Sequence, residues 1–282
     1  MDTKQIYEKV QEHYSLAANT TSNTYGHKVA KAFGYTEDEL EQIPKDANLG
    51  LSCGNPSAIA KLKEGETVID LGSGAGFDVF LAAKKVGVNG KAIGVDMNDD
   101  MLERANKNKE EAGAENVLFV KSPITKIDLT NEYADCIISN CVVNLVPEHQ
   151  KQLVFNETFR LLKPGGRLAI SDILLKKELP DELKKSIALY VGCISGASRV
   201  NEYEEYLRNA GFRDILIVDN KHDLNVYNDT PRNDARSSCC GKGCAAAASA
   251  DDPLVAFMSQ SKHLDFNEWA GSFQVYALKS SS

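Results

Sequence analysis

Short apolar runs alternate with longer, more polar stretches through the middle of the chain. We expect strands at the apolar runs, which are residues 67–71, 91–96, 117–120, 135–139 and 168–170. The stretches between them predict helices over residues 77–85, 99–111 and 147–162. Strands that are buried on both faces read as continuous apolar runs, and their alternation with helices is typical of parallel sheets. The pattern therefore predicts an α/β fold with a parallel sheet and helices on both of its faces.

The two ends of the chain depart from this alternation. Residues 1–45 are polar, with apolar positions near helical spacing that predict an amphipathic helical cap. Strands expected at residues 215–218 and 273–278 enclose an insertion rich in cysteine and alanine, which cannot build a core. We therefore expect an N-terminal cap over residues 1–58, a core over 59–178 and a C-terminal region over 179–282 that includes the last strands.

The charge balance limits the partners of the protein. Its 40 acidic and 32 basic residues give a net charge of −8, which disfavours nucleic acid and anionic membranes because both reward basic patches. The N-terminus lacks the pattern of a secretory signal, and no stretch approaches the roughly 18 apolar residues of a membrane span. We expect a cytoplasmic monomer with no nucleic-acid or membrane partner. Because cytoplasmic thiols stay reduced, we do not expect the seven cysteines to form a disulfide framework.

A glycine-rich turn follows the first expected strand and reads Asp70-Leu71-Gly72-Ser73-Gly74-Ala75-Gly76. Glycine lets the backbone approach a ligand, and the helix that follows offers unpaired N–H groups. Phe77 stands where the dinucleotide pattern needs its third glycine, and Asp70 would repel a pyrophosphate. A cofactor with an ammonium and a sulfonium suits Asp70 better. Asp96, at the end of the next strand, can bind both hydroxyls of a ribose.

This turn, Asp96, Asn140 and the Leu162-Lys163-Pro164-Gly165-Gly166-Arg167-Leu168 segment together resemble class I methyltransferases that use S-adenosylmethionine (SAM), over about residues 60 to 220. The resemblance implies a Rossmann-like sheet with SAM at the carboxyl ends of its strands. It implies that Asp70, Gly72 and Gly74 line the methionine end of SAM, and that Asp96 and Met97 hold its ribose and adenine. It adds further cofactor residues nearby, which are Ser73, Ser122, Ile124 and Asn140.

Three cysteines stand in short motifs around this core. Cys141 comes directly after the fourth strand in Ser-Asn-Cys-Val-Val-Asn-Leu, Cys53 begins Cys-Gly-Asn-Pro, and Cys193 lies in Gly-Cys-Ile-Ser-Gly-Ala after the fifth strand and a helix. The segment directly after the fourth strand, residues 139–147, offers no His or Glu as a general base. Three thiolates are soft ligands that can hold As(III) with its lone pair exposed, and methyl transfer to that lone pair needs no base.

These three motifs resemble those of arsenite methyltransferases over nearly the whole chain. The resemblance implies methyl transfer from SAM to thiol-bound arsenite and then methylarsenite, in arsenic detoxification, with glutathione or thioredoxin as reductant. Cys141 and Cys193 match its arsenic-ligand positions, and Cys53 matches a third cysteine of its thiol cycle. Many members carry a further cysteine, N-terminal to the one matching Cys53, as its redox partner. Residues 1–52 contain no cysteine, so that particular disulfide cannot form here.

Other interpretations of the cysteines stay open at this point. Cys136 lies inside an apolar strand, and we expect it in the core. The cluster in the insertion, Cys239, Cys240 and Cys244, resembles C-terminal clusters of some members, and we favour accessory As(III) capture over a structural zinc site. A methyltransferase for an organic small molecule would keep the cofactor turn and make the cysteines structural. A thiol protein that only binds As(III) would leave the cofactor turn without a purpose.

Overall fold

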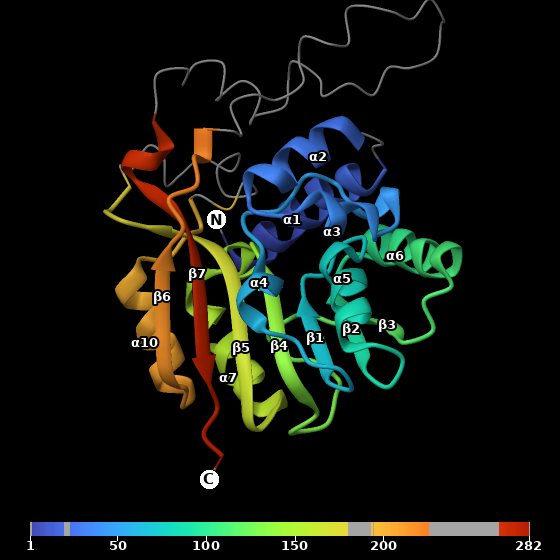
Figure 1. Ribbon diagram of the computed structural model, residues 1–282. Helices are drawn as coiled ribbons and strands as arrows, with labels where there is room; N and C mark the ends of the chain where they lie inside the picture. Colours follow the sequence, from blue (N-terminus) through green and yellow to red (C-terminus); the bar gives the residue numbers. More distant parts are fainter. Residues whose placement is uncertain (1, 20–22, 180–192, 194, 226–264, 282) are drawn as a thin grey trace, which may run out of the picture.

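The computed structural model describes residues 2–19, 23–179, 193, 195–225 and 265–281 (Figure 1). The helix expected between the fifth strand and Cys193 lies outside the described residues. The cluster of Cys239, Cys240 and Cys244 also lies outside them.

A seven-stranded sheet organises the described residues, with the strand order β3-β2-β1-β4-β5-β7-β6 (Figure 1). Its strands are β1 (Thr67–Leu71), β2 (Lys91–Asp96), β3 (Val117–Lys121), β4 (Ala134–Asn140), β5 (Leu162–Leu175), β6 (Arg213–Asp219) and β7 (Ala270–Leu278). All seven expected strands are present, although β5 begins earlier and ends later than its apolar run predicted. This arrangement confirms the Rossmann-like methyltransferase fold.

The parallel sheet expected from the alternating strands and helices is confirmed from β1 to β5, and β7 adds an antiparallel strand. The neighbouring pairs from β3 through β5 are parallel, whereas β7 is antiparallel to both β5 and β6. The backbone N–H of Lys176, just after β5, donates to the carbonyl of Trp269, just before β7. The chain therefore enters β7 at the edge where β5 ends and must run back along it, without the crossover that a parallel pair needs.

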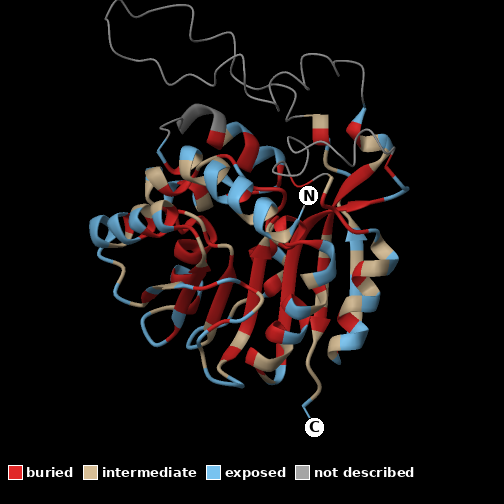
Figure 2. Cartoon of the chain, turned by 180° about the vertical axis from the view of Figure 1, so that it is seen from behind, coloured by how far each residue is buried: buried red, intermediate tan, exposed pale blue. Residues whose placement is uncertain are grey.

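Helices cover both faces of the sheet. They are α1 (Thr3–Ala18), α2 (Asn23–Ala32), α3 (Glu37–Glu41), α4 (Pro56–Ala60), α5 (Phe77–Val86), α6 (Asp99–Ala112), α7 (Lys151–Leu161) and α10 (Val200–Ala210), with short 3-10 turns η1 (Lys45–Ala47), η2 (Val143–Leu145), η3 (Glu148–Gln150) and η6 (Phe266–Glu268). Ile69 of β1 packs in one buried cluster with α7 and α10, and Val68 packs in a second cluster with α4 and α5. The alternation of side chains along the strands thus feeds two cores, and the strands are buried throughout the centre of the molecule (Figure 2).

The N-terminal cap is confirmed as helical. The side chain of Asp2 accepts a hydrogen bond from the backbone of Gln5 and begins α1 with a capping box. The amide of Asn98, which begins α6, donates to the carbonyl of Gln11 and to the hydroxyl of Ser15 on α1. The cap is therefore tied to the residues that follow β2. Among the described helices, none combines the length and the apolar character that crossing a bilayer requires.

Candidate active site

A cavity opens at the carboxyl ends of β1, β2 and β4. Its empty volume is about 1100 Å³, part of which is open to solvent, and α1 contributes Tyr7, Val10, Gln11 and Tyr14 to its wall. Every residue that the sequence suggested for a cofactor lines this cavity, namely Asp70, Gly72, Ser73, Gly74, Asp96, Met97, Ser122, Ile124 and Asn140. The fold therefore collects these residues around a single space.

The turn between β1 and α5 needs its glycines. Gly72 has a φ of +67°, and a Cβ atom there would lie 2.3 Å from Cγ2 of Val142. Gly74 has a φ of +51°, and its N–H donates to Oδ2 of Asp96 at 2.9 Å. Residues with a side chain are strained in this left-handed conformation. The turn therefore packs closely against the residue after Cys141 and is fixed to the end of β2.

Three carboxyl groups line the cavity, and the pKa of each is raised above its ordinary value. Burial, and then the charges of Asp78 and Asp96, raises the pKa of Asp70 well above its ordinary value. Burial raises the pKa of Asp78 to about 6, although hydrogen bonds from Asn140 and Tyr35 oppose it. Burial also raises the pKa of Asp96, against the backbone N–H groups of Asn98 and Gly74 that donate to it. A cationic ligand would relieve this repulsion.

Two polar side chains of the cavity could be stabilised by a ligand. Oγ of Ser73 is buried without a hydrogen-bond partner among the described residues. The pKa of the Asp70 carboxyl is raised by burial and by two neighbouring carboxyl groups. Buried polar groups without partners are costly in a folded protein. An ammonium or sulfonium beside Asp70 and an acceptor beside Ser73 would satisfy both. The residues of the cavity therefore fit SAM.

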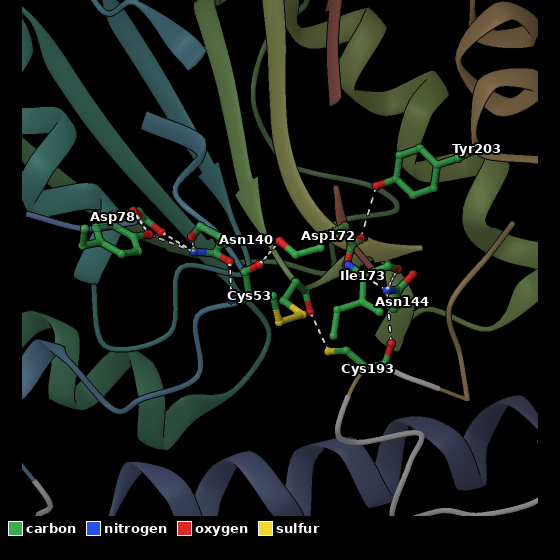
Figure 3. Close-up of a disulfide and its surroundings, with 12 residues drawn as sticks. Cys53, Asp78, Asn140, Asn144, Asp172, Ile173, Cys193 and Tyr203 are labelled. Carbon is green, nitrogen blue, oxygen red and sulfur yellow. Dashed lines mark hydrogen bonds between the residues drawn. A yellow bond between two sulfur atoms is a disulfide. The ribbon is translucent and has the colours of Figure 1, made fainter. Parts of the chain in front are cut away.

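The side chain of Asn140 forms more hydrogen bonds within the protein than its predicted role in cofactor binding suggests. Its side-chain nitrogen donates to the carbonyl of Gly54, the hydroxyl of Tyr35 and a carboxylate oxygen of Asp78, at 2.9, 2.9 and 3.0 Å. Its side-chain oxygen accepts from the N–H of Cys53 at 3.0 Å (Figure 3). Asn140 lines the cavity, but both ends of its amide hold the Cys53 loop and Asp78. A direct cofactor contact by this side chain stays a prediction.

Three cysteines from distant parts of the chain meet beside the cavity. Cys53, Cys141 and Cys193 are buried, and their sulfur atoms all lie within 4.8 Å of one another. Cys53 precedes α4, Cys141 follows β4 and lines the cavity, and Cys193 lies well beyond β5 (Figure 3). The three thiols singled out by their motifs are thus neighbours in space.

Two of these cysteines form a disulfide that the sequence did not predict. Cys53 and Cys141 are joined, with their Cα atoms 5.7 Å apart and 88 positions apart in sequence. We expected reduced thiols from the composition. The prediction failed because pairing depends on how Asn140 holds the Cys53 loop against the end of β4, and no local pattern reveals that contact.

The backbone at two of the cysteines is unusual. Cys141 has a φ of +59° and Cys193 a φ of +62°, in the left-handed region that residues other than glycine rarely adopt. The thiol of Cys193 donates to the carbonyl of Cys141 at 2.9 Å (Figure 3). Burial, and then the charge of Asp172, raises the pKa of Cys193, so it is held as a neutral thiol. Such conformations persist only where the surroundings enforce them.

The remaining described cysteine has the role expected of it. Cys136 is fully buried in β4 and packs in the cluster beneath α4 and α5. Burial raises its pKa to about 12. It therefore behaves as a core residue and contributes nothing to the group of three.

Comparison with known families identifies the chain. The family described as "Methyltransferase domain" matches residues 62–211, which is more than half of the sequence. The chain belongs to this family. The match includes the glycine turn, the carboxyl ends of β1, β2 and β4, and Cys141 and Cys193, whereas Cys53 lies outside it.

Individual relatives of this methyltransferase domain are named for arsenic. An arsenite methyltransferase of Halobacterium salinarum is 46% identical over 67% of this chain and 48% of that protein. Another, from Aquipseudomonas alcaligenes, is 34% identical over 77% of this chain and 64% of that protein. The crystal structure of an arsenic(III) S-adenosylmethionine methyltransferase from Chlamydomonas reinhardtii superposes with a TM-score of 0.54 at 25% identity, covering 89% of this chain and 73% of that one. The chain thus spans about half to two thirds of the two curated relatives.

Sequence reasoning missed several polar residues of this methyltransferase domain. Tyr35 and Asp78 support the Cys53 loop through Asn140. Asn144 contacts the backbone of Cys193, and Asp172 and Tyr203 follow behind it in a chain of hydrogen bonds (Figure 3). Asn144 belongs to the same short motif as Cys141, and Asp172 stands near the end of the fifth strand, where site residues gather in such sheets. Those positions were the available signals.

Proposed function

We propose that this methyltransferase domain transfers methyl groups from SAM to trivalent arsenic. Arsenite, held by Cys53, Cys141 and Cys193, is taken first, and methylarsenite, which has only two As–OH groups to exchange, is held by two of these thiols and taken second. The observation that carries the proposal is the group of three buried sulfur atoms, all within 4.8 Å of one another, beside a cavity that fits SAM. The names of the relatives support the same substrate. An organic acceptor would give no reason for three cysteines to meet at this place.

The chain's residues hold the arsenic and aim it. Each thiol that binds arsenite loses its proton as one As–S bond replaces one As–OH bond, and a water molecule leaves. Three sulfur ligands leave one lone pair on As(III), and soft thiolates suit this soft centre. When bound, SAM supplies an electrophilic methyl group. Because Cys141 lines the cavity, the arsenic would lie at its edge, and positioning alone contributes much of the rate enhancement.

Entry to this cycle requires a reductant. The disulfide between Cys53 and Cys141 leaves only Cys193 as a free ligand within the group. We propose that glutathione or thioredoxin supplies two electrons and two protons, which convert the disulfide to two thiols while the reductant becomes a disulfide. Methyl transfer oxidises arsenic from As(III) to As(V), so a second methylation needs two further electrons.

The setting of the reaction is also a proposal. We propose a cytoplasmic monomer that acts in arsenic detoxification without nucleic-acid or membrane partners, in keeping with its acidic composition. Accessory capture of As(III) by Cys239, Cys240 and Cys244 stays a prediction from the sequence.

Arsenic speciation tests the proposal. Protein reduced with glutathione or thioredoxin is incubated with arsenite and labelled SAM, and the arsenic species are separated. We expect labelled methylarsenicals from the wild type, and a loss of at least 100-fold in Cys141→Ala and Cys193→Ala because two sulfur ligands position the metalloid poorly. SAM affinity should stay within about twofold of the wild-type value, since neither thiol is one of the carboxyl groups expected to contact SAM.

Cys136→Ala is the matched control, because it removes a buried thiol that lies away from the group of three. It should keep its methylation rate. Wild-type activity in both Cys141→Ala and Cys193→Ala, or label found only on an organic acceptor, would contradict the proposal.

A further inference from the structure

A buried polar cluster reaches the backbone of Cys193 through Asn144, and the chemistry proposed above does not use it. We call Asn144, Asp172 and Tyr203 the Cys193 clamp (Figure 3). All three are fully buried. Burial of polar groups is costly unless they form hydrogen bonds, and a buried network of such bonds fixes the structure around it.

Asn144 is the centre of the clamp. Its side-chain nitrogen lies 2.8 Å from Oδ1 of Asp172, 2.6 Å from the carbonyl oxygen of Ile173 and 3.2 Å from the carbonyl oxygen of Cys193, so its two N–H groups are shared among three acceptors. The first two contacts fix the amide to β5, and the third connects it to the loop of Cys193. Asn144 therefore joins the cysteine to the sheet through one side chain.

Asp172 and Tyr203 fix Asn144 from behind. The hydroxyl of Tyr203 donates to Oδ2 of Asp172 at 3.2 Å, and the N–H of Ile173 donates to Oδ1 at 3.0 Å. Tyr203 belongs to α10, whose buried face packs on the sheet. The carboxyl group thus has a fixed orientation, and it presents an acceptor to Asn144.

The same loop is held again further along. The buried ammonium of Lys151 donates to the carbonyl of Gly196 at 2.5 Å and to the hydroxyl of Ser198 at 2.7 Å. Held by the clamp and by the hydrogen bonds of Lys151, Cys193 adopts its left-handed backbone, and its thiol points toward Cys141. This conformation needs enforcement from outside the residue.

We propose that Asn144, supported by Asp172 and Tyr203, is a positioning residue that holds Cys193 in the conformation that brings its sulfur to the other two. The inference rests on the proposed function for its arsenic ligand. In that proposal Asn144 contacts neither arsenic nor SAM. Asn144 acts only through the backbone of Cys193.

The test uses the full chain reduced with a phosphine and two readouts. The first is the rate at which iodoacetamide alkylates Cys193, followed by mass spectrometry with Cys136 as an internal reference. The second is arsenite affinity from equilibrium dialysis. In Asn144→Asp, a carboxylate would face Asp172 and two carbonyls, so we expect Cys193 to alkylate about tenfold faster and arsenite to bind about tenfold more weakly. Alkylation of Cys136 and the affinity for SAM should not change.

Three further variants make the test specific. Tyr203→Phe removes only the hydroxyl behind Asp172 and should move both readouts in the same direction, by a smaller factor. Asp172→Asn keeps an acceptor for Asn144 and should stay within about twofold of the wild type. Asn156→Asp makes the same chemical change on the exposed face of α7 and should change neither readout.

The outcomes separate the two proposals. Alkylation needs no arsenic, so it tests the clamp even if the wild type forms no methylated arsenic, which would overturn the proposed function alone. If Asn144→Asp fails to fold, Tyr203→Phe carries the test. Wild-type values of both readouts in Asn144→Asp, or in Tyr203→Phe where it stands in, would overturn the inference.

Discussion

At the scale of single residues, the site combines groups that a folded protein usually avoids. Cys141 and Cys193 have left-handed backbones, Ser73 and Asn144 each bury a polar atom without a partner among the described residues, and Asp172 is a buried carboxyl group. Strained and unsatisfied groups that gather at one place are typical of functional sites. The surrounding sheet must supply the free energy that keeps them there.

The carboxyl group of Asp172 should make stability depend on pH. Burial raises its pKa to about 7, against a donor from Ile173, the charge of Lys151 and the hydroxyl of Tyr203. Because the pKa is higher in the folded state, the unfolded protein releases this proton first. The stabilisation is therefore complete below about pH 4 and is lost as the pH rises through 7. It amounts to roughly 4 kcal/mol.

Urea unfolding of the wild type and Asp172→Asn between pH 4 and 8 measures this effect. The difference between their free energies of unfolding should shift against the wild type as the pH rises, since asparagine does not titrate. A difference that is constant over this range would show that Asp172 does not change its charge on folding.

At the scale of elements, the turn after β1 and the turn after β4 are packed as one unit. Gly72 lies against Val142, the residue next to Cys141. The glycine turn of the cavity and the group of three cysteines therefore share a contact. A displacement of either turn would therefore reach the other. On the proposed function, this contact would tie the position of bound SAM to the position of Cys141 and the arsenic that it holds.

A double substitution tests the contact. Gly72→Ala would place a methyl group against Val142 in a left-handed backbone, and we expect it to lower the free energy of unfolding by about 2–4 kcal/mol. Val142→Ala in the same chain makes room and should restore part of that loss, leaving the backbone strain. Urea unfolding of the four proteins gives the coupling between the two positions. Strictly additive losses would mean that the two turns do not press on each other.

At the scale of the whole molecule, the disulfide joins the segment before the sheet to the end of β4. Cys53 and Cys141 close a loop of 88 positions, and a cross-link of that span stabilises a fold by roughly 4–5 kcal/mol through the unfolded chain. A phosphine reductant should therefore lower the free energy of unfolding of the wild type by about that amount. It should have no such effect on Cys53→Ala, which lacks the bond between Cys53 and Cys141. Equal effects on both proteins would contradict this role of the bond.

The sequence revealed features that depend on neighbouring positions. Continuous apolar runs marked each strand, and the turn from Asp70 to Gly76 marked the cofactor wall. The sequence did not reveal contacts between residues that are far apart along the chain. The antiparallel direction of β7, the link between Cys53 and Cys141, and the partners of Asn140 all depend on how the sheet is assembled. Asp78 and Asn144 stood beside recognised motifs, but nothing local distinguishes a buried polar anchor from an exposed one.

The three sulfur atoms come from three separate stretches of chain, one before β1, one after β4 and one beyond β5. On the proposed function, bound arsenic would be a reversible cross-link between these three stretches. A ligand that binds only the folded form stabilises it by mass action. The reduced, empty protein would then be the form that cellular proteases degrade fastest, and arsenic would lengthen the lifetime of the enzyme that removes it. The cellular concentration of the enzyme would then rise with the concentration of arsenic, without any change in the rate at which the enzyme is synthesised.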